Sequence, residues 1–249
     1  MKEKVEIKTN ELTKNLLSRQ DYLVTQGNDL AKAFGNLKAF EHKLLDFCFS
    51  YVTRDSKLDD TFKAQASDVL KHFGLTDSGT NYTRVIKGFK TLNEETPLYF
   101  LVKDEDGSDS VLMTQLFNFI RISKNKTITF KFSEHVAPYV FDLREKYYSF
   151  HLSELSRIKS KYTLILMKMY QAQKMGNQKT VTITGEMNDW QDWFLGVDRS
   201  SNWTAGRFKQ KVLNVAVDEL IETLNVTIVL NTIKKGVKVT GYEITINSD

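Results

Sequence analysis

The chain carries one order of structural signals twice. Phe73-Gly74-Leu75 leads to Asn81-Tyr82-Thr83, and about 120 residues later Leu195-Gly196-Val197 leads to Asn202-Trp203-Thr204. In both halves, residues at helical spacing come first and alternating β-forming residues follow. A recurring unit of this size is typical of a duplicated domain. The sequence therefore predicts an α+β protein built from two tandem copies of one module.

Each copy contains three predicted helices followed by a predicted hairpin. Helices are expected at residues 37–52, 68–73 and 81–92 in the first copy and at residues 162–173, 185–193 and 202–223 in the second. Strands are expected at residues 98–102, 110–116, 117–122 and 127–132, and then at residues 226–230 and 237–246. This is the layout of a winged helix-turn-helix, whose third helix enters the major groove of DNA while the hairpin, or wing, contacts the backbone.

The domain organisation follows from this repeat. We expect an N-terminal arm (residues 1–27), an N-terminal winged-helix domain (28–146) and a C-terminal winged-helix domain (147–249). The single cysteine, Cys48, lies among apolar residues and provides no disulfide framework. No apolar run approaches the roughly 20 residues that a membrane span needs. These features together predict a cytoplasmic protein that does not enter a membrane.

Basic residues are clustered, although the formal net charge of +4 is modest. No acidic residue occurs from Ser156 to Gly185. The basic residues of this stretch are Arg157, Lys159, Lys161, Lys168, Lys174 and Lys179. Such a local surplus is typical of a surface that binds phosphates, although an ordinary solvated helix face is the alternative. We expect the start of this stretch to contact DNA through Arg157, Lys159, Ser160 and Lys161.

The third helix of the second copy has a predicted DNA-binding side. Its apolar stripe is expected to consist of Phe208, Val212, Val215, Ala216, Leu220 and Leu224. The candidate DNA contacts are Asn202, Thr204, Arg207, Lys209, Gln210, Lys211 and Asn214. Because arginine can form two hydrogen bonds with guanine and glutamine two with adenine, we expect Arg207 and Gln210 to read bases. Lys209 and Lys211 are expected to hold phosphates, and Trp203 is expected to be a core or helix-stapling aromatic residue.

The first copy and the wing of the second supply further candidates. Arg84, Lys87 and Lys90 share one face of the third helix of the first copy, which Asn81 begins, and we expect them to contact phosphates more than bases. Lys234, Lys235 and Lys238 are predicted to form a basic wing tip, with a solvated hairpin turn as the alternative.

Three segments resemble the iteron-binding plasmid replication initiators, often called the Rep_3 or initiator Rep family. The first runs from Phe132 through Val140, with Leu143 and Tyr147, into the block from Leu152 to Tyr170; the second is Phe208 to Leu220; the third is Lys234 to Val239 with Tyr242 to Ile244. A fainter match covers Asn28 to Leu45. The chain departs from the family pattern at Met167, where arginine is common, and at Leu220-Ile221-Glu222, where Glu-Ile-Asn is commoner.

This resemblance implies a function. It implies binding of double-stranded DNA at direct repeats of a plasmid origin, mostly through the C-terminal module, with backbone contact and homodimer formation by the N-terminal one. It further implies that dimers repress the protein's own gene and that a host initiator and the replicative helicase are partners. A transcriptional repressor built from the same modules is the alternative, and a protein-interaction module without DNA binding is a third possibility.

Catalysis is not expected. Some plasmid initiators nick DNA with a tyrosine beside a metal-binding histidine pair, for which Tyr147 and Tyr148 would be the candidate nucleophiles. The four histidines, however, are isolated in the sequence, and the chain has no phosphate-binding loop, nucleophile elbow or cysteine cluster. The sequence therefore predicts a binding protein without an enzymatic activity, a metal or a cofactor.

Overall fold

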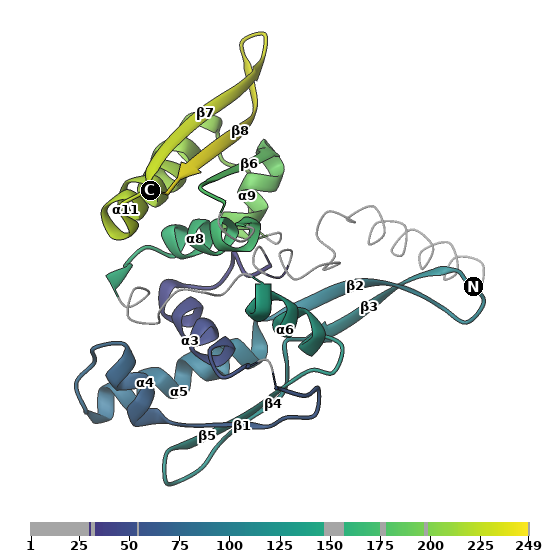
Figure 1. Ribbon diagram of the computed structural model, residues 1–249, viewed down its shortest axis with the longest axis vertical. Helices are drawn as coiled ribbons and strands as arrows, with labels where there is room; N and C mark the ends of the chain where they lie inside the picture. The colour runs from purple at the N-terminus through teal and green to yellow at the C-terminus, as the bar shows by residue number, and fades with distance from the viewer. Residues whose placement is uncertain are drawn as a thin grey trace.

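The computed structural model describes residues 30, 33–53, 55–146, 157–174, 178–196 and 199–248. The predicted arm, the start of the predicted C-terminal domain at residue 147, and Tyr147 and Tyr148 lie outside the described residues. The two copies form two separate bodies that meet through helices near the middle of the molecule (Figure 1).

The first copy is a winged helix with an added hairpin. Its elements are α3 (Ala39–Phe49), β1 (Phe62–Gln65), α4 (Ala66–His72), α5 (Gly79–Glu94), β2 (Pro97–Lys103), β3 (Asp109–Gln115), β4 (Phe117–Ile122), β5 (Thr127–Phe132) and α6 (Ala137–Lys146). Strands β1, β5 and β4 form one antiparallel sheet in that order, and β4–β5 is the wing. Strands β2 and β3 pair only with each other and form a long hairpin that extends away from the rest of the domain (Figure 1).

The second copy repeats this topology, and its described residues contain no counterpart of the added hairpin. Its elements are α8 (Lys161–Gln173), β6 (Thr180–Glu186), α9 (Met187–Leu195), α10 (Ala205–Phe208), the π-helical segment η2 (Lys209–Leu213), α11 (Asn214–Leu224), β7 (Thr227–Lys235) and β8 (Lys238–Asn247). The strand order β6-β8-β7 corresponds position by position to β1-β5-β4. The predicted α+β fold of two tandem winged helices is therefore confirmed.

Two strands were not predicted from the sequence. Each is the first strand of its sheet and runs directly into the second helix of its copy: β1 into α4 and β6 into α9. Strand β1 has four residues, too few to give a clear alternation. Strand β6 includes residues 185 and 186, which were assigned to the start of a helix. The helix begins later because Glu186 and Asp189 form a reciprocal capping box there.

Each winged helix has its own aromatic core. In the first, Phe47, Phe89, Phe130 and Phe132 are fully buried between α3, α5 and the sheet. In the second, Trp190, Phe194, Phe208 and Tyr242 fill the corresponding space, and the indole Nε1 of Trp190 donates a hydrogen bond to the carbonyl oxygen of Tyr242 at 3.0 Å. Burial of such large side chains fixes the third helix of each copy against its sheet.

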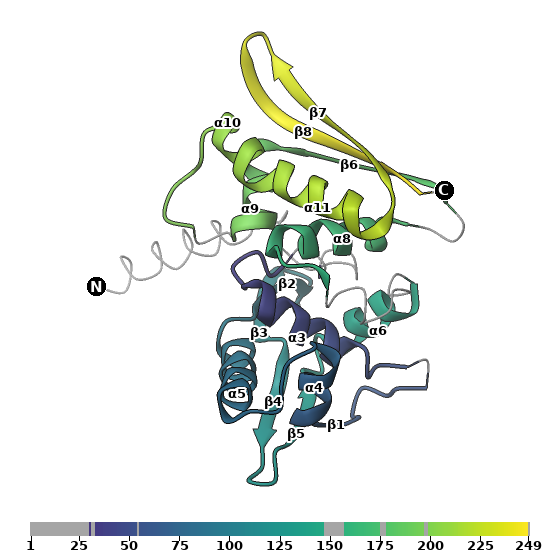
Figure 2. The ribbon, with the colours of Figure 1, turned by 90° about the vertical axis from the view of Figure 1, so that its left-hand side faces the viewer.

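The two copies meet through α3 and α8, which lie side by side (Figure 2). The ammonium of Lys168 on α8 lies 3.1 Å from a carboxylate oxygen of Asp46 on α3, and both side chains are buried. The same ammonium lies 2.9 Å from Nδ1 of His42. Burial holds the pKa of His42 well below its ordinary value, and the charges of Lys168 and Lys161 lower it further, so His42 is neutral. Lys168, part of the basic stretch in the sequence, is thus an internal residue and not part of the surface.

Backbone contact closes the same interface. A Cβ atom added to Gly35 would lie 2.5 Å from the carbonyl oxygen of Trp193 and 2.9 Å from that of Asp192, both at the end of α9. Lys161 donates a hydrogen bond from Nζ to the carbonyl oxygen of Gly35 at 2.8 Å. The two winged helices are therefore held by a glycine contact as well as by a buried ion pair.

We predict that breaking the Asp46–Lys168 pair destabilises the protein strongly. Asp46→Ala leaves the Lys168 charge buried without its carboxylate, and the free energy of unfolding should fall by about 3 to 5 kcal/mol, as measured by denaturant titration. The double variant Asp46→Leu/Lys168→Met removes both charges and should recover most of that loss.

The exposed pair Lys90–Glu94, at 3.8 Å, supplies the control. Lys90→Ala should change the free energy of unfolding by less than about 1 kcal/mol because water screens this pair. If Asp46→Ala lowered the free energy of unfolding by a similarly small amount, the buried pair would contribute no more to stability than an exposed one.

Candidate nucleic-acid interface

The topology places the third helix of each copy at a surface. These helices are α5 in the first copy and α10, η2 and α11, which run continuously, in the second. In the view of Figure 2, α5 and α10 both lie at the left-hand side of their domains. Each helix covers its core with one face and leaves the other exposed. In a winged helix this exposed face is the one that enters a DNA groove.

The π-helical segment changes which residues of the second recognition helix are buried. Phe208, Val212, Ala216 and Leu220 are buried as predicted, and Leu213, the last residue of η2, and Val217 are buried beside them. Val215, predicted to be part of the apolar stripe, is instead 40% exposed. Val217 is thus buried in place of Val215, just after the wider turn of the π-helical segment. This correction lies next to the predicted base-reading residues.

The structure brings the central candidates onto one exposed surface. Arg207, Gln210, Lys211 and Asn214 are all exposed. Lys209 differs: it is half-buried, and its Nζ donates a hydrogen bond to Oγ1 of Thr232 on β7 at 3.2 Å. It links the recognition helix to the wing, so its ammonium is less available to a phosphate than those of its neighbours.

Charge divides the recognition helix along its length. Its first turns carry Arg207 and Lys211, whereas Asp218 and Glu222 are exposed on its last turns. Glu219 turns toward α8, where its carboxylate accepts hydrogen bonds from the backbone N–H groups of Lys159 (2.8 Å) and Ser160 (3.0 Å). Because the acidic end would repel phosphates, only the first turns are suited to a DNA groove.

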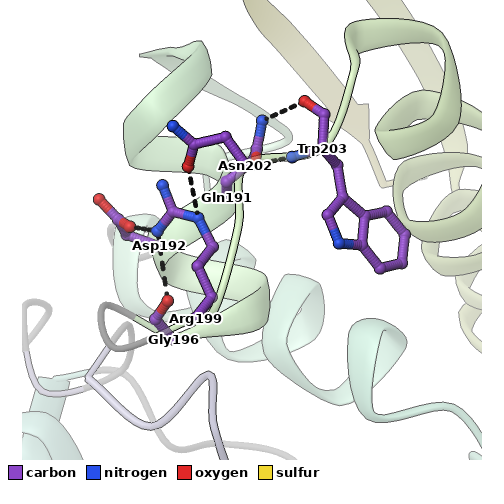
Figure 3. Close-up of polar contacts among 6 residues, drawn as sticks. All are labelled: Gln191, Asp192, Gly196, Arg199, Asn202 and Trp203. Carbon is purple, nitrogen blue, oxygen red and sulfur yellow. Dashed lines mark hydrogen bonds and ion pairs between the residues drawn. The ribbon is translucent and has the colours of Figure 1, made fainter.

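Side chains tie the turn before the recognition helix to α9 (Figure 3). Arg199 pairs with Asp192, donates to the carbonyl oxygen of Gly196 at 3.2 Å, and donates from Nε to Oδ1 of Asn202 at 3.0 Å. Asn202, a predicted DNA contact, therefore has its side-chain oxygen occupied within the turn. Thr204 is exposed just before α10 begins.

Trp203 has a second role besides packing. Its ring is partly buried against the second core, as expected for a stapling residue. The guanidinium carbon of Arg207 also lies 4.2 Å from the centroid of the Trp203 ring, a cation–π contact. The most favoured base-reading candidate thus rests on an aromatic surface.

The first copy arranges its candidates differently. Lys87 and Lys90 are exposed on α5, and Arg84 stacks over the ring of Phe40 with 4.2 Å between the guanidinium carbon and the centroid. The side-chain amide of Asn81 donates to the carbonyl oxygen of Thr76 at 2.8 Å, in the turn before α5. Contact of Asn81 and of the three basic residues with DNA stays a prediction.

Two candidates at the start of α8 serve the fold. The side chain of Ser160 caps α8 by accepting a hydrogen bond from the N–H of Tyr162 at 3.1 Å. Lys161 is directed at Gly35, and burial lowers the pKa of its ammonium. Both side chains thus have partners within the protein, and their contact with DNA stays a prediction. Arg157 and Lys159 are exposed and remain candidates.

The wing of the second copy ends in an exposed basic turn. Lys234, Lys235 and Lys238 are all exposed around Gly236, whose φ of 63° permits the tight turn. Strand β6 pairs with β8 only as far as Gly241, so the tip of the β7–β8 ribbon extends beyond the sheet (Figures 1 and 2). In this position the lysines can reach a phosphate backbone.

Sequence reasoning missed three residues of this interface. Gln191 and Arg199 order the turn, and Lys126 in the first wing lies over the ring of Tyr82 with 3.5 Å between Nζ and the centroid. Arg199 lies in an acid-free stretch and resembled a surface residue. Nothing in the local sequence marks Gln191, because its partner is the backbone of a residue in the following turn.

Within the ranges that the structure describes, no group of three or more His, Cys, Asp or Glu residues is placed to hold a metal ion. None of the described helices is long and apolar enough to cross a membrane.

Two family descriptions match the chain. "Initiator Replication protein, WH1" matches residues 23–171, and "Initiator Rep protein, WH2" matches residues 186–246. No curated protein matches the sequence.

A solved structure shares the fold. The crystal structure of the Pi initiator protein in complex with iteron DNA is similar over 88% of this chain and 94% of that one, with 16% sequence identity and a TM-score of 0.66. A structure of domains 2 and 3 of RctB is similar over 89% of this chain and 81% of that one, with 12% identity and a TM-score of 0.47. The likeness to the first structure shows that this chain has the same two-domain fold.

We predict that Arg207 and Lys87 contribute to DNA binding in different ways. Arg207→Ala should weaken binding to a selected duplex by about 1 to 3 kcal/mol and relax the sequence preference. Lys87→Ala should weaken binding to all duplexes alike, because a phosphate contact carries no sequence information. Titration of both variants with selected and random duplexes measures this difference. Equal losses on both duplexes for Arg207→Ala would contradict its assignment to base reading.

Proposed function

The chain belongs to the initiator Rep family of replication proteins, and from that membership we propose that it is a plasmid replication initiator that binds iteron repeats as duplex DNA. The observation that carries the proposal is an exposed basic third helix at the same topological position in both winged helices. The Pi initiator protein, which has this fold, was crystallised with iteron DNA. Two such helices in one chain suit a site longer than a single winged helix covers.

The two modules would divide the work of binding. Arg207 and Gln210 would read base edges in the major groove, while Lys211 and the wing lysines would hold phosphates. The first module would bind the backbone through Arg84, Lys87 and Lys90. Arg157 and Lys159, exposed just before α8, would add positive charge there.

Initiation would follow from binding without a covalent step. Several copies arrayed on direct repeats would bend or strain the adjacent AT-rich duplex, so that part of the binding free energy is used to deform DNA. That deformation favours opening of the duplex. The protein would therefore act in the cytoplasm as a non-catalytic initiator, with a host initiator and the replicative helicase recruited to the opened region.

Regulation would use a second binding mode. Homodimers formed through the N-terminal module would bind an inverted repeat and repress the protein's own gene. A repressor acting only in this way is the competing function, since the same modules would serve it. The two functions differ in the arrangement of sites on the DNA.

We predict that the protein protects tandem direct repeats beside an AT-rich stretch. Duplexes selected from a random pool would define the bound sequence, and footprinting on the DNA flanking the gene would locate it. A single inverted repeat at the promoter would instead favour the repressor.

Salt provides an independent check on the same complexes. The logarithm of the binding constant should fall linearly with the logarithm of salt concentration, because neutralised phosphates release counterions. No enriched duplex, together with salt-insensitive binding to a protein partner, would leave only an interaction module.

A further inference from the structure

One buried amide fixes the residue that carries Arg207. Gln191 on α9 is 1% exposed, and its side chain forms two hydrogen bonds with one backbone unit. Its Nε2 donates to the carbonyl oxygen of Trp203 at 2.9 Å, and the N–H of Trp203 donates to its Oε1 at 2.7 Å (Figure 3). A single side chain therefore satisfies both polar groups of that residue and fixes its orientation.

Trp203, held in this way, supports the guanidinium of Arg207. The indole ring of Trp203 points away from Gln191 in Figure 3, and Arg207, one turn into the helix, lies over its face at 4.2 Å. A free arginine side chain loses much rotamer freedom when it binds two acceptors of a base. A guanidinium already held against a ring has lost part of that freedom before DNA arrives.

The first module also holds an arginine of its recognition helix over a ring, Arg84 over Phe40 of α3. At the place equivalent to Trp203, however, it has Tyr82, and the cation over that ring is Lys126 from the wing turn. The combination of a ring fixed by a buried amide and an arginine of the same recognition helix over it is thus described in the module expected to read bases. The added ties of Arg199 to Asp192, Gly196 and Asn202 restrain the rest of the same turn.

We propose that Gln191 is a positioning residue for sequence readout: its buried amide holds Trp203 in the orientation in which the indole face presents the Arg207 guanidinium to a base pair. This inference rests on the proposed function, DNA binding through α10. Gln191 itself is buried and makes no contact with DNA. It acts through Trp203 on the sequence preference of Arg207.

The test is a double-mutant cycle measured by DNA titration. Gln191→Leu removes both hydrogen bonds at similar volume and should lower the ratio of selected to random duplex affinity by about tenfold, within the range expected for a lost bidentate contact. Affinity for random duplex should change by less than about twofold, because phosphate contacts remain. In the Arg207→Ala background, Gln191→Leu should cause almost no further loss, since the two residues act on one contact.

Two further variants separate positioning from folding. Trp203→Leu keeps the backbone hydrogen bonds to Gln191 but removes the aromatic surface, and it should lower the affinity ratio as Gln191→Leu does. Gln65→Leu is the control of the same chemical change, because the side chain of Gln65 donates from Nε2 to Oγ1 of Thr127 at 3.0 Å within the first sheet, far in sequence from Arg207, and its loss should leave the ratio unchanged.

The possible results distinguish a failure of the positioning role of Gln191 from a failure of the proposed DNA binding. An unchanged ratio in Gln191→Leu, or a loss in the double variant equal to the product of the two single losses, would overturn the positioning role alone. A wild-type protein without any preference for a selected duplex would overturn the proposed function and the positioning role together.

Discussion

The arrangement of the whole molecule depends on a contact between the first helices of the two winged helices. Asp46 of α3 and Lys168 of α8 meet where water is excluded, so separating them would leave two buried charges without partners. Beside them, Gly35 lies so close to the end of α9 that a methyl group would collide with backbone. Apolar helices can slide over one another at little cost, whereas this pair of contacts permits one register. The relative position of α5 and α10 is therefore fixed by residues that lie in neither helix.

The recognition helix of the second module serves two purposes in separate parts. Its first turns carry the exposed basic and amide side chains, while its later turns pack through Leu213, Val217 and Leu220 and end with exposed acids. The π-helical segment lies where one part becomes the other. Glu219, in the later part, holds the start of α8 and so connects this helix to the interface between the modules. DNA bound by the first turns, as we propose, would thus be linked through this helix to the contact between the domains.

The sequence predicted the repeated architecture because periodic patterns report which face of an element is buried. It did not reveal where individual polar residues lie. Lys161 and Lys168 fall in an acid-free stretch, yet their partners, Gly35 and Asp46, are far away in the chain, and only folding brings them together. Val215 was placed wrongly because a local π-turn has no clear sequence signal. The exposure of Arg207 followed from spacing, whereas its support by Trp203 and Gln191 required the geometry of the turn.

Within the described part of the chain, the β2–β3 hairpin occurs in one of the two modules and makes them unlike. Copies bound in the same direction along DNA would therefore meet through two different surfaces, the front of one molecule facing the back of the next. Head-to-tail contacts form an open row unless the rotation between copies closes a ring, so a row of such molecules along DNA would have no inherent end. The number of repeats in the DNA, and not a property of the protein, would set the number of molecules in the row.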